Sequence, residues 1–299
     1  EGEDSQIDNT FPQVIEERIL KPNGDELIKK YKKGKFLGKG GFAKCYEFQC
    51  LNNRKIYAVK IVTKANLNKT SAKQKLKSEI KIHKSLFHKH IVKFEHVFED
   101  SENVYILLEL CKNKTLSDIM KKRKIITEFE CKYFINQILK AVNFMHKNKI
   151  IHRDLKLGNL FLNEEMEIKI GDFGLATIVE FPGQLRYTVC GTPNYIAPEI
   201  LEGKNCGHSY EVDFWAIGVI IYTLLIGRPP YETDEVKETY KRIKANEFSY
   251  PSHIYISPEA KDFINKLLII NPAERMTMDE MKNHDFMKKY PPPKVLPDS

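Results

Sequence analysis

Hydrophobic and polar positions follow two different periods along the chain, and the period changes near residue 111. Before that point, short alternating runs rich in β-formers predict strands at 35–37, 44–48, 56–62, 90–99 and 104–110, with one helix at 71–86. After it, apolar positions recur at helical spacing and predict helices at 116–122, 128–147, 210–225, 234–245, 258–269 and 277–283. We therefore expect an α+β protein with a small β-rich lobe followed by a larger, mostly helical lobe.

The two ends of the chain differ in composition from the region between them. Residues 1–30 are polar and interrupted by Pro12 and by Pro22-Asn23-Gly24, which indicates an extension partly strapped to the domain. The last twelve residues are proline-rich, as a linker or tail is. The expected organisation is an extension at 1–30, a small lobe at 31–111, a large lobe at 112–287 and a tail at 288–299.

Nothing in the sequence predicts a membrane or secreted protein. The longest apolar run, Trp215–Gly227, is shorter than the roughly 20 residues that a spanning helix needs. The first eight residues include Glu1, Glu3, Asp4 and Asp8, whereas a signal peptide begins with basic residues. The six cysteines form no CxxC pair, so we expect reduced thiols in a cytoplasmic or nuclear protein.

The net charge of +8 is concentrated in the small lobe. Residues 35–108 contain fifteen basic and six acidic side chains. Such an excess suits nucleic acid, an acidic partner or a phosphate ligand, but it also suits a solvated helix face. Because no zinc-finger spacing or RNA-binding aromatic motif accompanies the charge, we do not expect nucleic acid as a partner.

A glycine-rich stretch, Gly38-Lys39-Gly40-Gly41-Phe42-Ala43-Lys44-Cys45, lies between two predicted strands. Glycines let backbone N–H groups approach a phosphate closely, although a plain tight turn has the same composition. The stretch lacks the GKS/T of a Walker loop, and no helix opens at its end as in a dinucleotide-binding fold. Lys60, near the end of a later strand, could reach phosphates if Glu79 on the following helix holds it; otherwise both are ordinary surface charges.

Two later motifs place polar groups inside apolar runs, which packing alone does not explain. In the stretch 151–162, Asp154 can accept a hydroxyl proton, Lys156 can neutralise phosphate charge and Asn159 can ligate a metal. Asp172 follows in Gly171-Asp172-Phe173-Gly174, where flanking glycines can present its carboxylate to a cation. This order of motifs indicates phosphoryl transfer.

The full series of motifs resembles the protein-kinase signature over residues 31–287, ending with Ala197-Pro198-Glu199. The resemblance implies Mg²⁺ and ATP as cofactors, Asp154 as catalytic base, Lys60 paired with Glu79 on the phosphates, and Asn159 and Asp172 as metal ligands. Residues 107–111 would form the hinge, in which backbone groups of Glu109 and Cys111 bind adenine and Leu108 is the gatekeeper. The nucleotide site would include Leu37, Gly38, Lys39, Gly40, Gly41, Phe42, Ala43, Cys45, Ala58, Lys60 and Phe161. By the same resemblance Asp213 braces the catalytic loop, and Arg275 pairs with Glu199.

Several stretches are similar to the polo-like kinases in particular. Ala43 stands where other kinases have a third glycine and Cys45 where they have valine, and both departures are typical of that family. Lys156, two residues after Asp154, resembles the serine/threonine branch. The family implies protein substrates with Ser or Thr in an acidic context, for which Arg186 is a candidate contact, and a role in cell division with centrosome or spindle association. We expect a monomeric catalytic domain.

The resemblance also implies control by phosphorylation. Thr188 lies between Asp172-Phe173-Gly174 and Ala197-Pro198-Glu199, where an upstream kinase would phosphorylate it. A phosphate at Thr188 would pair with Arg153 and order the segment, and we expect nearby Thr192 to pack against the catalytic loop. The alternatives left open are a pseudokinase scaffold, against which the intact motifs argue, a kinase of small molecules and a nucleic-acid-binding module.

Overall fold

The computed structural model describes residues 11–41, 43–289, 291 and 296, which fall into two compact units. The smaller unit contains the described residues up to Lys75 together with Lys93–Leu110. The larger unit contains Leu76–Val92 and the described residues from Cys111 onward. The boundary at Lys75 falls inside a helix, α1 (Thr70–Ser85), so the residues of this one helix are divided between the units.

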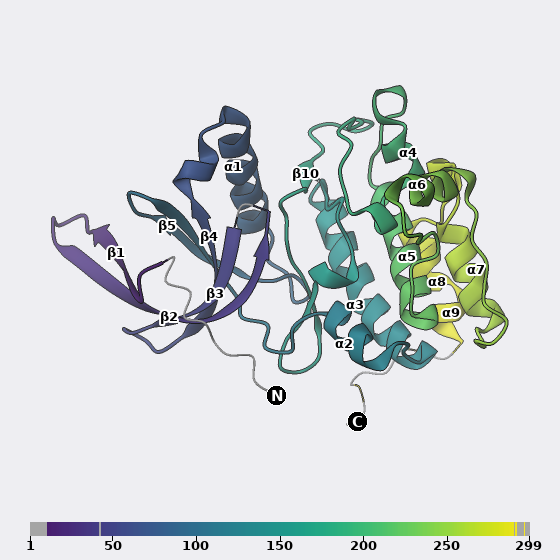
Figure 1. Ribbon diagram of the computed structural model, residues 1–299, viewed down its shortest axis with the longest axis horizontal. Helices are drawn as coiled ribbons and strands as arrows, with labels where there is room; N and C mark the ends of the chain where they lie inside the picture. Colours follow the sequence, from purple (N-terminus) through teal and green to yellow (C-terminus); the bar gives the residue numbers. More distant parts are fainter. Residues whose placement is uncertain (1–10, 42, 290, 292–295, 297–299) are drawn as a thin grey trace. The chain divides into compact units, whose positions relative to one another are not determined.

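The smaller unit is built on one antiparallel sheet with the strand order β1-β2-β3-β4-β6-β5 (Figure 1). Its strands are β1 (Val14–Leu20), β2 (Glu26–Gly40), β3 (Ala43–Cys50), β4 (Ile56–Thr63), β5 (Phe94–Glu99) and β6 (Asn103–Leu108). Because strand side chains alternate between the two faces, every second residue of β3, β4 and β6 faces one core, to which these strands contribute Tyr46, Phe48, Cys50, Val59, Ile61, Tyr105 and Leu107. An aromatic stack of Tyr31, Phe98 and Tyr105, with ring centroids 5.4 and 4.8 Å apart, extends this core.

The larger unit is mostly helical and is organised around α5. Its helices are α2 (Leu116–Arg123), α3 (Glu128–Lys147), α4 (Pro198–Leu201), α5 (Glu211–Ile226), α6 (Val236–Ala245), α7 (Pro258–Leu267), α8 (Met278–Asn283) and α9 (Asp285–Lys288). Two small antiparallel pairs join β7 (Ile150–Ile151) to β10 (Thr177–Ile178) and β8 (Leu160–Leu162) to β9 (Ile168–Ile170). Every residue of α5 from Val212 to Ile226 is buried, and α5 packs against both α3 and α7 (Figure 1).

Local sequence signals define the ends of the main helices. Thr127 caps α3 by accepting from the Glu130 backbone N–H while the Glu130 side chain accepts from the Thr127 backbone, a reciprocal pair that satisfies two otherwise unpaired donors. Gly227 ends α5 in the left-handed conformation, with φ of +92°. A Cβ at this position would lie 2.9 Å from the Lys124 carbonyl oxygen, so both conformation and space require glycine.

Two strand predictions need correction. The segment expected as an extension contributes β1, and β2 begins at Glu26 rather than 35. The reason is that Pro22-Asn23-Gly24 forms the turn of a hairpin in which the Lys21 backbone N–H donates to the Asp25 carbonyl at 2.8 Å. The strand expected from residue 90 begins at Phe94. The residues before it are held instead by backbone bonds between Val92 and Ile170 and between Ile170 and His90.

No helix in the described parts of the chain combines the length and the apolar character required to cross a bilayer. The most apolar one, α5, has 16 residues, and it is enclosed by protein rather than exposed.

Candidate active site

In the smaller unit, strand pairing brings the glycine-rich stretch beside Lys60. The stretch forms the tip of the β2–β3 hairpin, where Gly38 is opposite Cys45 and Gly40 is opposite Ala43. Cys45 in turn lies opposite Lys60 on β4. Three adjacent strands therefore bring together residues that the sequence predicts for one nucleotide site. Phe42, also predicted there, lies outside the described residues.

The predicted hinge residues follow β6. Leu108 is the last residue of the strand and lies opposite Ala58 on β4. The backbone N–H of Glu109 donates to the Lys93 carbonyl at 2.9 Å, and its side-chain Oε2 accepts from the Lys93 N–H at 3.0 Å. Because that N–H is engaged in the sheet, any adenine contact by the Glu109 backbone must use its carbonyl oxygen.

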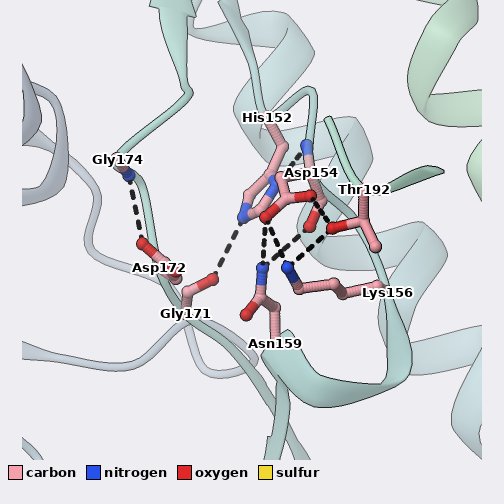
Figure 2. A network of polar contacts seen from close by, with 8 residues as sticks. All are labelled: His152, Asp154, Lys156, Asn159, Gly171, Asp172, Gly174 and Thr192. Carbon is pink, nitrogen blue, oxygen red and sulfur yellow. Dashed lines mark hydrogen bonds and ion pairs between the residues drawn. The ribbon is translucent and has the colours of Figure 1, made fainter. Parts of the chain in front are cut away.

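In the larger unit, Asp154 is the centre of a dense hydrogen-bond network (Figure 2). Lys156 Nζ donates to its Oδ2 at 2.9 Å, and the Thr192 hydroxyl donates to its Oδ1 at 2.7 Å. Lys156 Nζ also donates to the Thr192 hydroxyl at 2.7 Å, which closes a triangle. Thr192 therefore packs against the catalytic loop as predicted. Asp154 is only 8% exposed, so this triangle holds a nearly buried carboxylate in one orientation.

Asn159 fixes the same carboxylate from another side. Its Nδ2 donates to the Asp154 carbonyl at 2.8 Å and to Asp154 Oδ2 at 3.1 Å. Because both bonds use the amide nitrogen, the amide oxygen points away from Asp154, as Figure 2 shows. The orientation suits an oxygen ligand for a cation.

The imidazole of His152 links the two motifs. Its Nδ1 accepts from the Asp154 backbone N–H at 3.2 Å, so the proton of the neutral ring is on Nε2, which donates to the Gly171 carbonyl at 3.1 Å. Arg153, which follows His152, has a φ of +65°, and Asp172, which follows Gly171, has a φ of +60°. Left-handed backbone at non-glycine residues costs free energy, and it concentrates at sites where geometry serves function.

Acidic oxygens cluster at the Asp172 motif. Asp172 Oδ1 accepts from the Gly174 N–H at 3.3 Å. A Cβ on Gly174 would lie 3.3 Å from Asp172 Oδ1 and 3.5 Å from Glu79 Oε2, so two carboxylates border this one glycine. Among the described residues, no group of three or more His, Cys, Asp or Glu side chains could hold a metal ion. A cation held here by Asp172 and Asn159 would need ligand oxygens from outside the chain, as Mg²⁺ takes from phosphates and water.

Asp213 braces the catalytic loop from within the core, as predicted. Its Oδ2 accepts from the His152 N–H at 3.0 Å and from His146 Nε2 at 2.8 Å, and its Oδ1 accepts from the Arg153 N–H at 2.9 Å. Complete burial by itself raises the pKa of this carboxyl, but the bonds from His146 and the His152 backbone outweigh it and hold the pKa below its ordinary value. Asp213 is therefore an ionised brace for the unusual backbone at Arg153.

A row of rings connects α1 to the catalytic loop. The His83 ring lies 4.6 Å from the Phe173 ring, which lies 5.2 Å from the His152 ring. His83 is fixed by a 2.7 Å bond between its Nε2 and the Val92 carbonyl. Phe173 is 1% exposed, so the aspartate motif and the half of α1 that carries Glu79 are packed as one core.

A buried ion pair connects the activation segment, residues 172–199, to the helical core at its last residue, Glu199. The Arg275 guanidinium donates twice to Glu199, at 2.7 Å to each carboxylate oxygen, and lies 5.0 Å from the centroid of the Trp215 ring. It also donates to backbone carbonyls of Glu211, Ile269 and Ile270. This confirms the predicted pairing, and the two-pronged geometry is one that arginine alone supplies.

Basic side chains gather around Arg153 from three separate parts of the larger unit. Arg153 Nε donates to the Leu175 carbonyl at 2.8 Å, and its Nη1 lies 3.5 Å from His208 Nε2. Arg186 and His208 are joined by reciprocal backbone bonds of 2.9 and 2.8 Å. Burial, with the charges of Arg153 and Arg186, lowers the pKa of His208 to about 4. Thr188, two residues beyond Arg186, is exposed.

The structure gathers the predicted residues in two sets. Gly38, Cys45 and Lys60 are cross-strand neighbours in the smaller unit, while Asp154, Lys156 and Asn159 are bonded together in the larger. The remaining predicted residues are divided in the same way. In the smaller unit, Leu37 and Lys39 flank Gly38 on β2, and Gly41 lies in the turn before β3. In the larger unit, Cys111 begins a stretch of the chain, and Phe161 on β8 packs against Gly171.

Sequence reasoning missed two roles. The pattern does not reveal that His83 packs on Phe173, or that the His152 ring joins Asp154 to Gly171. His83 had no signal beyond its spacing, whereas His152 precedes Arg153-Asp154 and could have been examined as a motif member.

Comparison with known proteins agrees with this geometry. Residues 31–287 match the family model described as the protein kinase domain. This chain belongs to the protein kinase family. It is 58% identical over 96% of its length to a maize (Zea mays) protein named "Probable serine/threonine-protein kinase CCRP1", covering 46% of that protein. It is 52% identical over 90% of its length to serine/threonine-protein kinase PLK1 of Xenopus laevis, covering 44% of it. It is also 52% identical over 91% of its length to serine/threonine-protein kinase polo of Drosophila melanogaster, covering 46% of it.

These similarities confirm the predicted resemblance to polo-like kinases and the predicted α+β kinase fold, with an antiparallel sheet in one lobe and helices in the other. The chain spans less than half the length of these relatives. The kinase family implies the use of ATP with a divalent metal, and protein substrates.

Proposed function

We propose that this chain transfers the γ-phosphoryl group of ATP to serine and threonine hydroxyl groups of proteins. The observation that carries the proposal is the Asp154 carboxylate, held by Lys156, Thr192 and Asn159 in a nearly buried site. A carboxylate fixed in this way can orient a hydroxyl group, and the neighbouring ammonium can stabilise negative charge in transfer.

In the proposed reaction, a substrate hydroxyl oxygen forms a bond to the γ-phosphorus while the bond from that phosphorus to the β–γ bridging oxygen breaks. The hydroxyl proton passes to Asp154, and the electrons of the broken bond leave with ADP. Lys156, 2.9 Å from Asp154, offers its charge to the transferring group. Positioning and electrostatics supply most of the catalysis in this class of reaction.

Residues predicted from the sequence would orient the nucleotide. The backbone of the glycine-rich hairpin would contact the phosphates, and Lys60, paired with Glu79, would hold the α and β phosphates. Leu108, Glu109 and Cys111 would contact adenine, Glu109 through its carbonyl. The strand register that aligns Gly38, Cys45 and Lys60 supports this assignment.

Asn159 and Asp172 would hold Mg²⁺. The donor set fits, since Mg²⁺ prefers oxygen ligands, the Asn159 amide turns its nitrogen toward Asp154, and the Asp172 carboxylate is exposed. When bound, the ion would neutralise charge on the phosphate oxygens. Asn159 and Asp172 then keep two oxygen ligands in place, one braced by Asp154 and one by the Gly174 backbone.

Substitution of Asp154 tests the proposal directly. We expect Asp154→Asn to lower transfer of labelled phosphate from ATP to casein by a factor of roughly 10² to 10⁴, because it removes the proton acceptor. Calorimetric ATP affinity should stay within about twofold, since binding itself does not use the base. Glu238→Gln, at an exposed helix position, is the control and should match the parent. Full activity in Asp154→Asn would refute the assignment.

Phosphorylation of Thr188 would regulate the same site. Arg153 and Arg186 bring positive charge together near an exposed threonine, which supports a site for a dianionic phosphate. We expect stoichiometric phosphorylation by an added kinase to raise turnover at least tenfold, and Thr188→Val to abolish that gain with no change in melting temperature. Equal turnover of the phosphorylated and unphosphorylated enzyme would sink the regulatory role.

The substrate context and cellular role are further parts of the proposal. The basic groups around Arg186 and the polo-like similarity support a preference for acidic residues before the target hydroxyl. Paired peptides that differ only in Asp or Lys at those positions test it, and faster phosphorylation of the Lys peptide would contradict it. The same similarity supports a role in cell division and a cytoplasmic or nuclear location that includes centrosomes or spindles, which imaging of the tagged full-length protein would check.

A further inference from the structure

The segment before residue 31 lies outside the match to the kinase family model, yet its described part is built into the smaller unit. The family model begins at residue 31. Phe11, Ile15 and Glu17 are 8%, 4% and 5% exposed, and β1 pairs with β2 in an unbroken register from Val14 to Leu20. Burial of this extent means that the segment contributes to the core of the sheet rather than trailing from it.

Phe11 is held in place at the side of β3. Its ring meets the Tyr46 ring edge-on, with centroids 5.8 Å apart and planes at 78°. Its carbonyl oxygen accepts from Lys33 Nζ at 2.9 Å, and the same ammonium lies 5.2 Å from the Tyr46 ring centroid. Lys33 is only 7% exposed, so the bond that fixes Phe11 is sheltered from water.

Tyr46 and Lys44 connect Phe11 to the glycine-rich hairpin. Tyr46 lies opposite Phe36 at the base of the hairpin, and their rings are 5.3 Å apart. Lys44 lies within the hairpin, opposite Lys39, and its Nζ is 5.8 Å from the Phe11 ring centroid. Phe11 therefore contacts both the base and one arm of the element that is proposed to cover the ATP phosphates.

The described glycines at the tip of that hairpin have open space around them. A Cβ placed on Gly38, Gly40 or Gly41 would meet no atom within 4 Å. Side chains that could anchor the tip are absent at these three glycines, so among the described residues the direction of the hairpin is set by Ala43, which is 4% exposed and lies opposite Val62, and lower down by Tyr46 and Lys44. A contact there acts on the tip through the two paired strands.

We propose that Phe11, clamped by Lys33 against Tyr46, is a positioning residue that orients the glycine-rich hairpin for the phosphates of ATP. The inference rests on the proposed function, because it assigns the hairpin to ATP. Removal of the ring lets the hairpin sample more directions. Part of the binding free energy of ATP is then used to order the hairpin, so the affinity for ATP falls. Turnover at saturating ATP stays the same, since Asp154 and Lys156 are held by their own bonds in the larger unit.

Kinetics of Phe11→Ala test this inference in the full chain. We expect the KM for ATP to rise roughly three- to tenfold with kcat within twofold of the parent, because ordering a loop on binding weakens affinity by about that much. Phe11→Tyr, which retains the ring, should restore the parent KM. Ile15→Ala is the matched control, since it removes a buried side chain of the same segment without a ring contact to Tyr46; it should lower the melting temperature but leave the KM unchanged.

Two results would overturn the inference. One is an unchanged KM in Phe11→Ala; the other is an equal rise in Ile15→Ala, which would mean that general loosening of the sheet is responsible. Calorimetric titration with ATP separates this inference from the proposed function. If the parent binds ATP but transfers no phosphate, the proposed function fails, and a weaker ATP affinity in Phe11→Ala alone would still support the positioning role. If the parent does not bind ATP, both fail.

Discussion

A single hydroxyl group joins the activation segment to the catalytic loop. The Thr192 oxygen donates to Asp154 and accepts from Lys156, each at 2.7 Å, so both charged partners depend on one side chain from a later part of the chain. We expect Thr192→Val to reduce kcat by roughly ten- to a hundredfold, since a hydrogen bond to a charged group contributes about 1.5–3 kcal/mol. Thr192→Ser keeps the hydroxyl and should retain most activity. Similar kcat values in the two variants, measured in the same transfer assay, would contradict this role.

At the residue scale, the sequence identified chemistry better than geometry. Asp154, Lys156, Asn159 and Asp172 could be named because polar groups inside apolar runs are costly unless they are used. Their mutual contacts could not be predicted, because the Thr192 bond spans 38 positions and the left-handed backbone at Asp172 depends on packing around it. Local patterns contain no information on contacts of that kind.

At the scale of elements, the pair Glu199–Arg275 joins α4 to the segment after α7. Both side chains are almost completely buried, at 2% and 0% exposure. Removal of one partner leaves an uncompensated charge in the core, so we expect Arg275→Met to lower the free energy of unfolding by about 3–5 kcal/mol. Arg275→Lys should recover little of it, because an ammonium cannot donate to both oxygens in the same plane.

Urea denaturation of the larger unit would measure these changes. The exposed pair Lys241–Glu238 is the control, and Lys241→Met should alter stability by less than about 1 kcal/mol. If Arg275→Met lowered the free energy of unfolding by no more than the control does, the buried pair would not be a main source of stability.

Element boundaries were predictable where local signals were strong. The α3 prediction, 128–147, matches the structure because the Thr127 capping pair and a long apolar period define it. Strand β1 was missed because its apolar residues stand in pairs on either side of Glu16-Glu17-Arg18 and do not alternate with polar ones, so the segment resembles a polar extension. Its burial comes from tertiary contacts such as Tyr31 Oη donating to Glu17 at 2.8 Å, which sequence periodicity does not reveal.

At the scale of the whole molecule, two buried histidines make stability depend on pH. Burial lowers the pKa of both His90 and His208 to about 4 from an ordinary value of 6.5. Between these values the unfolded chain binds protons that the folded chain does not, so stability is complete above pH 6.5 and declines as the pH falls toward 4. The decline is on the order of 1 kcal/mol per pH unit for each histidine.

The urea midpoint at pH 7, 6 and 5 measures this effect. We expect a steady decrease, and a shallower one in His208→Gln, which removes one of the two groups. His253→Gln, at an exposed histidine, should follow the parent. A pH-independent midpoint, or equal slopes in the parent and His208→Gln, would show that His208 is not responsible.

The enclosure of α5 has a consequence for how the protein is made. The helix has no polar face, and the elements that cover it come from both sides of it in the sequence. Helix α3 precedes it, whereas α7 begins 32 residues after its end (Ile226 to Pro258) and Arg275 lies 49 residues after its end. During synthesis, α5 therefore leaves the ribosome before α7 and Arg275 have been made. The core around α5 cannot be completed until these later residues have emerged. In that interval the nascent chain exposes its most apolar stretch, which is when a chaperone is most needed.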